Sequence, residues 1–194
     1  MKTDRRAWAL AVLLVLGGPG AVRAQPQPQL PQDCILVFGH GRNHDPAQPQ
    51  QDQGWDQLNL GFNEAVRQPL LAAGHRAPGL VLPVAATDLP ANLERLLGEA
   101  QRQGCSQVLE TTVFGDPQAQ ALILRLRLYP LLGSKGPRLP ATLPQVGAPL
   151  YTDQREFDLN ARVLERLRPV LLGQEMGQLA LPRLAPPAAA RPAE

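Results

Sequence analysis

The chain is poor in the residue types from which most enzyme sites are built. Its 194 residues include only two cysteines, three histidines and two serines. Neither Ser106 nor Ser134 lies in a G-x-S-x-G sequence, and Gly39-His40-Gly41 lacks the third glycine of a phosphate-binding loop. The sequence therefore does not support a serine hydrolase or a nucleotide-binding enzyme, and we expect a protein without catalytic activity.

Long apolar runs are also missing. The run from Ala7 to Leu16 has ten residues, whereas a membrane-spanning helix needs about 20. Basic residues precede this run, and Val22-Arg23-Ala24 supplies the small residues that signal peptidase reads. We therefore expect a signal peptide that is cleaved after Ala24, and a mature protein that lies in the periplasm and has no transmembrane segment.

Lysine is scarce as well, so arginine carries nearly all of the positive charge. The predicted signal peptide holds four of the 19 basic and one of the 17 acidic residues, which leaves 15 and 16. A chain this close to neutral gives no reason to expect a nucleic-acid partner. Arg125, Arg127 and Tyr129 share one side of a predicted strand. We favour a plain solvent-facing side there; the alternative is a site for an anionic partner such as peptidoglycan or a lipid headgroup.

The two cysteines are Cys34 and Cys105, and neither belongs to a C-x-x-C motif, which argues against a zinc or redox role. In an exported protein an even pair usually closes a disulfide. We therefore predict a Cys34–Cys105 bridge, with two buried free thiols as the alternative.

Hydrophobic periodicity predicts an α/β fold with a mixed β-sheet and the element order β-α-β-α-β-β-β-α. A Pro/Gln-rich linker over 25–33 leads into a single domain over 34–172, and an Ala/Pro-rich disordered tail follows over 173–194. Residues 39–54 and 130–149 are expected to be irregular. Strands are expected over 35–38, 80–84, 107–114, 121–129 and 150–157, and helices over 59–73, 89–103 and 159–171.

The proline in the second strand, Pro83, cannot donate to a sheet ladder and therefore places that strand at an edge. If the first strand lies between the second and the third, right-handed crossovers put the first two helices on opposite faces of the sheet. The same order brings Cys34 and Cys105 to the starts of neighbouring parallel strands, within reach of a disulfide.

Five stretches carry a resemblance to a known group of proteins: ILVF, FNEAVRQPLLAAGH, ANLERLLGEAQRQG, SQVLETTVFGD and ALILRLRLYPL. In element order they resemble the small periplasmic α/β domain shared by the N-terminal domain of the Tol translocation protein, the curli-secretion lipoprotein and the outer-membrane activators of penicillin-binding proteins. The likeness covers roughly residues 34–172. It implies a protein that acts through contacts with an envelope partner. The chain departs from these lipoproteins in lacking a lipid-modified cysteine, and its first loop is long and bears histidines.

That first loop contains the candidate metal ligands. His40, His44 and Asp45 follow the first strand, on the side of a parallel sheet where ligands bind, and could hold a divalent metal. We favour a solvated polar loop in which the histidines are incidental. His75 is expected at the opposite end of the sheet. The sequence thus favours an exported accessory protein that binds an envelope protein and holds no cofactor. The alternative is a small periplasmic metal-binding protein that uses His40, His44 and Asp45.

Overall fold

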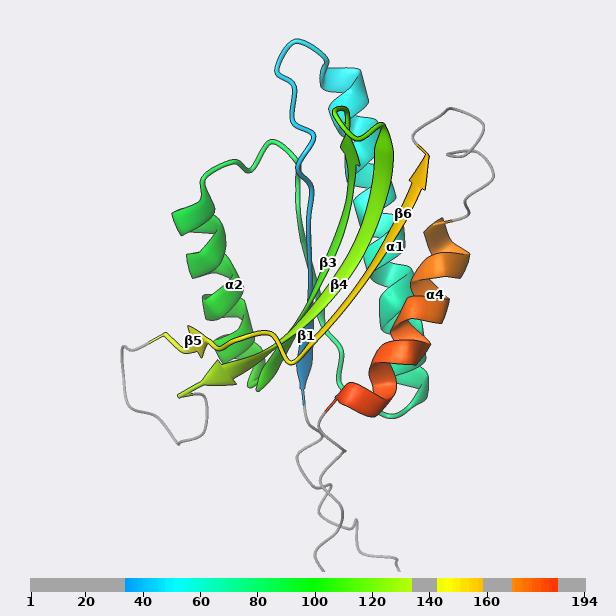
Figure 1. Ribbon diagram of the computed structural model, residues 1–194. Coiled ribbons are helices and arrows are strands. Elements are labelled where there is room, and N and C mark those ends of the chain that lie inside the picture. Colours follow the sequence, from blue (N-terminus) through cyan, green and yellow to red (C-terminus); the bar gives the residue numbers. More distant parts are fainter. Residues whose placement is uncertain (1–33, 134–142, 159–168, 185–194) are drawn as a thin grey trace, which may run out of the picture.

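In the part of the chain that the structure describes, three helices pack on a six-stranded mixed β-sheet (Figure 1). The computed structural model describes residues 34–133, 143–158 and 169–184. The strands are β1 (Ile35–His40), β2 (Gly79–Leu82), β3 (Gln107–Asp116), β4 (Ala121–Leu132), β5 (Gln145–Val146) and β6 (Tyr151–Asp158). The helices are α1 (Pro49–Ala72), α2 (Leu89–Gln103) and α4 (Pro169–Ala180), and a short 3-10 helix, η1 (Leu181–Arg183), follows α4.

The strand order confirms the predicted topology. It runs β2-β1-β3-β4, with β1 parallel to both β2 and β3, β3 antiparallel to β4, and β6 antiparallel to β4. The β2 strand lies at an edge, as predicted. It spans Gly79–Leu82 rather than 80–84, so Pro83 follows the strand and does not lie in its ladder. A disulfide joins Cys34, beside the start of β1, to Cys105, just before β3. The predicted bridge and the order that places its two ends together are therefore both confirmed.

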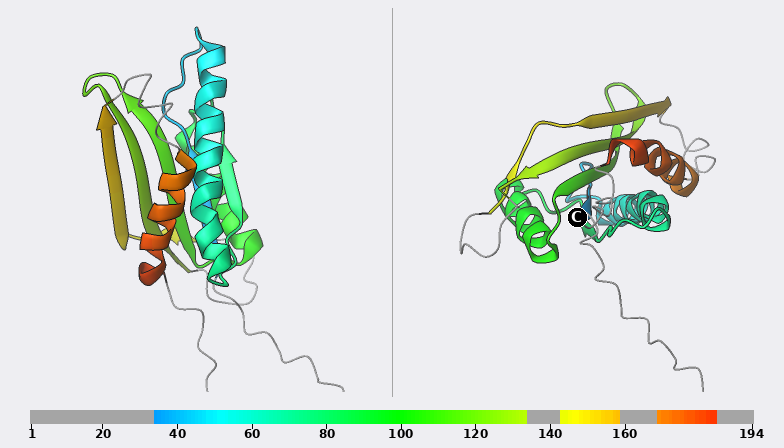
Figure 2. Two further views of the ribbon diagram at one scale, coloured as in Figure 1. Left: turned by 90° about the vertical axis from the view of Figure 1, so that its right-hand side faces the viewer. Right: turned by 90° about the horizontal axis from the view of Figure 1, so that it is seen from below.

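Two apolar layers hold the helices on opposite faces of the sheet. The larger layer lies under α1 and α4, and the smaller one joins α2 to β1, β2 and the start of β3. The alternation in β4 decides which residues enter the larger layer, because Leu122, Leu124, Leu126 and Leu128 all point into it and are almost fully buried. Figure 2 shows α4 beside α1 on this face.

The helix α1 starts ten residues earlier than predicted, at Pro49 rather than Asn59. Proline is tolerated in the first turn of a helix, where its missing N–H has no intrahelical partner, and Asp52 places a carboxylate at the positive end of the helix dipole. The prediction of irregular chain over 39–54 is therefore wrong for residues 49–54, and also for Gly39 and His40, which belong to β1. Trp55 consequently lies inside the helix, where it packs against the larger apolar layer.

The C-terminal boundary of the domain was also predicted wrongly. Residues 173–180 belong to α4, and the chain packs on through η1 to the buried Leu184, so the predicted disordered tail does not begin at Gly173. The reason is close packing of helices: Gly173 and Gly177 lie against α1, where an added Cβ would come within 2.7 Å of α1 atoms at both positions. The rest of the predicted last helix, residues 159–168, lies outside the described residues.

Smaller differences concern the ends of elements. The strand predicted over 150–157 is confirmed as β6, whereas the segment predicted as a loop over 130–149 contains the two-residue strand β5. Asp88 caps α2 as expected, and Gly104 ends it in the left-handed conformation. The predicted signal peptide, the linker and residues 185–194 lie outside the described residues. Within 34–133, 143–158 and 169–184, no helix is both long and apolar enough to cross a membrane.

Candidate binding face of the sheet

On its face of the sheet, α2 covers β2, β1 and the start of β3, and no described helix packs on this face over the rest of β3, β4 and β6 (Figure 1). Strand register places the side chains of this uncovered area in neighbouring rows. We call it the open face. It consists of His40 and Arg42 at the end of β1, Glu110, Thr112 and Phe114 of β3, Ile123, Arg125, Arg127 and Tyr129 of β4, and Thr152 and Gln154 of β6.

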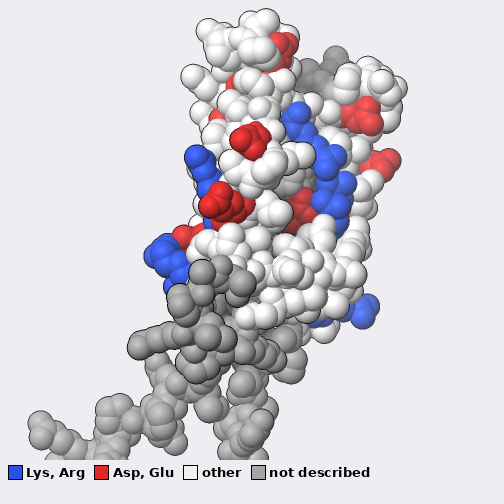
Figure 3. Space-filling model, turned by 90° about the vertical axis from the view of Figure 1, so that its left-hand side faces the viewer, with Lys and Arg blue, Asp and Glu red and all other residues white. Residues whose placement is uncertain are grey.

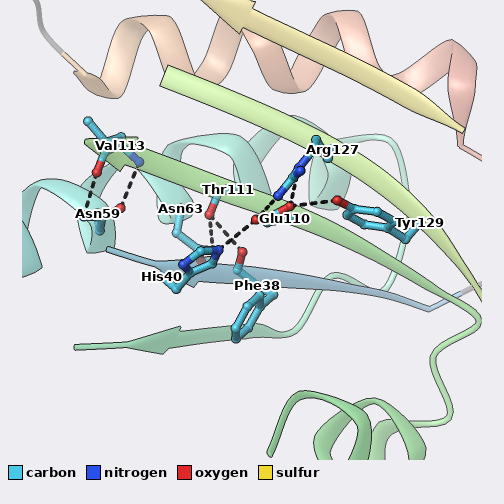
Figure 4. Close-up of polar contacts among 9 residues, drawn as sticks. All are labelled: Phe38, His40, Asn59, Asn63, Glu110, Thr111, Val113, Arg127 and Tyr129. Atoms are coloured by element: carbon cyan, nitrogen blue, oxygen red, sulfur yellow. Dashed lines mark hydrogen bonds and ion pairs between the residues drawn. The ribbon is translucent and has the colours of Figure 1, made fainter. Parts of the chain in front are cut away.

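Glu110 is the centre of the polar network on this face (Figure 4). Its carboxylate accepts hydrogen bonds from His40 Nε2 at 2.7 Å, from Arg127 Nε and Nη2 at 2.6 and 2.7 Å, and from the Tyr129 hydroxyl at 3.2 Å. The residue is 6% exposed. Burial alone raises the pKa of Glu110, but the bonds from His40 and Arg127 outweigh it and lower the pKa to about 2. Glu110 is therefore an ionised acceptor at neutral pH.

A second cluster lies further along the same face. The guanidinium groups of Arg42 and Arg125 lie over the ring of Phe114, at 5.0 and 5.5 Å from its centroid. Burial, followed by repulsion from the neighbouring cations Arg127 and Arg42, lowers the pKa of Arg125. Figure 3, viewed from the α2 side, shows a row of basic side chains with acidic ones beside it. The face thus carries more positive charge than Glu110 can neutralise.

The arginines therefore do not fit the favoured prediction of a plain solvent-facing strand. Arg125, Arg127 and Tyr129 do share one side of β4, as expected, but all three are half-buried. Arg127 is paired with Glu110, and this raises the pKa of Arg127. Half-buried arginines beside aromatic rings are typical of a binding surface rather than of a solvated one.

A small pocket adjoins the open face where β1 meets α2. Its volume is about 140 Å³. His40 contributes to both the pocket and the polar network, and the α2 side of the pocket ends in Leu89, which is 72% exposed. The lining residues are Phe38, His40, Leu89, Asn92, Leu93 and Leu96. An apolar recess therefore lies next to the charged part of the face.

The three candidate metal ligands are not brought together. His40 binds Glu110, whereas His44 Nδ1 contacts Asp52 Oδ2 at 2.7 Å on the first turn of α1. Asp45 uses its carboxylate to accept from the Ala47 N–H at 2.9 Å, and its own N–H donates to Asp52. These contacts organise the start of α1. Among the described residues, no group of three His, Cys, Asp or Glu side chains could hold a metal ion.

The backbone bond from Asp45 and the contact with His44 together lower the pKa of Asp52, against the opposing effect of burial. His75 is buried. It lies at the start of β1, the end away from His40, because its neighbour Arg76 pairs with Cys34 in an isolated bridge. The predicted separation of His75 from the other two histidines is thus confirmed.

Two asparagines hold the edge of β3 beyond the end of β1. The Asn59 side chain accepts from Val113 N–H at 3.0 Å and donates to Val113 C=O at 3.2 Å (Figure 4). Asn43 makes the same pair of bonds with Gly115, both at 2.8 Å. The amides thus replace the strand that β3 lacks there, and they keep the Phe114 end of the open face in place.

Sequence reasoning missed Glu110, Arg42 and Phe114. A signal for Glu110 was present, because an acidic residue inside an otherwise apolar strand needs a partner. The hairpin turn after Asp116 places Glu110 directly opposite Arg127.

No family model and no curated protein matches this chain. Solved structures that resemble it include a variant of the PelC dodecamer from Paraburkholderia phytofirmans, with 11% identity and a TM-score of 0.38, over 78% of this chain and 88% of that chain. Another is lipoprotein GNA1162 from Neisseria meningitidis, with 18% identity and a TM-score of 0.34, over 75% and 98%. TM-scores this low carry no argument about this chain. Neither structure is described as a Tol, curli-secretion or penicillin-binding-protein-activator protein, so that resemblance stays a prediction.

Proposed function

We propose that this protein is an exported, non-catalytic accessory protein of the bacterial cell envelope, and that it binds a protein partner through the open face. The observation that carries the proposal is the composition of that face. Arg125, Arg127 and Tyr129 are half-buried alternate residues of β4, on a part of this sheet face that no described helix covers. Arginine and tyrosine are the residue types that dominate binding energy at protein interfaces.

The disulfide supports export. Cys34 and Cys105 are 2% and 1% exposed, and bonds of this kind form and persist in oxidising compartments. The signal-peptide pattern of residues 1–24 points the same way.

The state of Glu110 supports a binding role over a catalytic one. A general base works best when its pKa lies near the operating pH, whereas the pKa of Glu110 is about 2. The His40–Glu110 pair is also tied to Arg127, so its carboxylate already accepts a full set of hydrogen bonds.

Site-specific photocrosslinking in intact cells tests the proposal. A photoreactive amino acid replaces Thr152 or Gln154, two exposed residues of β6 that lie opposite Arg127 and Arg125 on the open face. The control position is Leu179 of α4, which is 50% exposed on the opposite side of the sheet. We expect positions 152 and 154 to capture one envelope protein, identified by mass spectrometry, and position 179 not to capture it. Capture of that protein at 179 alone, or of nothing at 152 and 154, overturns the proposal.

A further inference from the structure

Two arginines on the same side of β4 differ in what their side chains bind. The Nε and Nη2 atoms of Arg127 form one edge of its guanidinium, and both donate to the Glu110 carboxylate. The same two atoms of Arg125 are buried, and no described residue accepts from them. An arginine edge of this shape matches the two oxygens of a carboxylate, as the neighbouring pair demonstrates.

Thr112 supplies a third donor at the same place. It lies directly opposite Arg125 in the β3–β4 register and is 0% exposed. Its Oγ1 has no hydrogen-bond partner among the described residues. Buried donors without acceptors cost free energy, and a guanidinium costs more than a neutral group. The cross-strand pair Thr112–Arg125 therefore holds three buried donors that an oxyanion could satisfy.

Arg42 adds a second positive charge to this place. Its guanidinium shares the Phe114 ring with that of Arg125, although the two groups repel each other. Glu110, the nearby carboxylate, is already held by Arg127 and His40. An additional anion would reduce the repulsion and satisfy the buried donors at the same time.

We propose that Arg125, Thr112 and Arg42 form a binding site for the carboxylate of an acidic side chain on the partner protein. This inference rests on the proposed function and deepens it. A carboxylate is favoured because Glu110 already binds the equivalent edge of Arg127, which is half-buried like Arg125, and because a doubly charged phosphate is costlier to desolvate there. Since Arg125 Nε and Nη2 are buried, binding requires the Arg125 side chain to turn.

The test uses the purified, disulfide-bonded mature protein and an acetylated hexaglutamate peptide as the probe, with hexaglutamine as the neutral control. Titration is followed by calorimetry and by the NMR signals of the arginine Nε–H groups. We expect hexaglutamate to shift the Arg125 signal and hexaglutamine to leave it unchanged. Arg125→Gln and Arg125→Lys should each weaken binding at least tenfold, because neither side chain offers the two-donor edge.

The matched control is Arg183→Gln, which removes the same charge from an exposed position in η1 on the other side of the sheet. It should change hexaglutamate binding less than twofold. Thr112→Val should weaken hexaglutamate binding, whereas Thr112→Ser, which keeps the hydroxyl, should bind like the wild type. Urea unfolding confirms that each variant is folded.

Any of three results overturns the inference. One is hexaglutamate binding that Arg125→Gln leaves unchanged. Another is Arg125-dependent binding of inorganic phosphate or phosphatidylglycerol vesicles that exceeds binding of hexaglutamate, which would make the site one for phosphate groups. The third is that hexaglutamate does not bind at all. If photocrosslinking from positions 152 and 154 persists while hexaglutamate fails to bind, this inference fails and the proposed function stands.

Discussion

At the scale of single residues, the fold contains a buried carboxylate, Glu110, that accepts hydrogen bonds from three side chains. Glu110 has a folded-state pKa of about 2, below its ordinary value of 4.5. Its ionised form therefore stabilises the fold above about pH 4.5, and this contribution is lost as the pH falls toward 2. The difference in pKa corresponds to roughly 3 kcal/mol.

Glu110→Gln should remove this pH dependence. We expect the free energy of unfolding of the variant to be roughly 3 kcal/mol lower than that of the wild type at pH 7. This difference should shrink as the pH approaches 2. Urea unfolding at pH 7, 4 and 2.5 measures it. Glu94→Gln, at an exposed position on α2, is the matched control and should stay within about 0.5 kcal/mol of the wild type. Equal pH profiles for wild type and Glu110→Gln would contradict the role given to Glu110.

The residue scale also shows where sequence reasoning reaches its limit. The Glu110–Arg127 pair follows from counting back along the hairpin, because antiparallel register is fixed by the turn. The amide bonds of Asn43 and Asn59 to β3 do not follow in this way. They exist because β1 ends at His40 while β3 continues to Asp116, and the relative lengths of parallel strands are set by tertiary packing.

At the scale of elements, the pattern of apolar residues predicted the β-sheet and α2 well, since both bury long side chains at regular spacing. It failed for residues 173–180 of α4, because this part of the helix packs partly through glycines and not through long apolar side chains alone. Gly173 and Gly177 let it approach the backbone of α1, and glycine-rich sequence otherwise resembles a tail without a core.

Substituting these glycines should therefore destabilise the protein. In Gly173→Ala the new Cβ would lie 2.7 Å from Ala65 Cβ, and in Gly177→Ala it would lie 2.7 Å from Val66 O. We expect each variant to lose about 1–3 kcal/mol, the usual cost of overpacking. Gly98→Ala is the control, because α2 has open space there and alanine favours a helix by about 0.5–1 kcal/mol. Thermal unfolding should give opposite signs; a stabilised Gly173→Ala would refute the close contact of α4 with α1.

At the scale of the whole molecule, the disulfide links the fold to the compartment. It ties the start of β1 to the start of β3 across 71 residues of sequence, beside the layer under α2. Closing a loop of this length restricts the unfolded chain and contributes about 4 kcal/mol. A protein that folds in a reducing compartment would lose that contribution, so export and stability are coupled.

This coupling gives the last prediction. The exported protein should begin at Gln25 and have the mass of the oxidised form, as N-terminal sequencing and intact mass spectrometry will show. The same chain without residues 1–24, made in a reducing cytoplasm, should carry two free thiols and unfold in urea with about 4 kcal/mol less free energy. Oxidising the reduced chain in vitro should restore the lost unfolding free energy, whereas a Cys34→Ala/Cys105→Ala variant should not respond to oxidant.

An N-terminus at Met1 in the envelope fraction would contradict cleavage after Ala24. Equal unfolding free energies for the reduced and oxidised chains would show that the disulfide does not stabilise the fold.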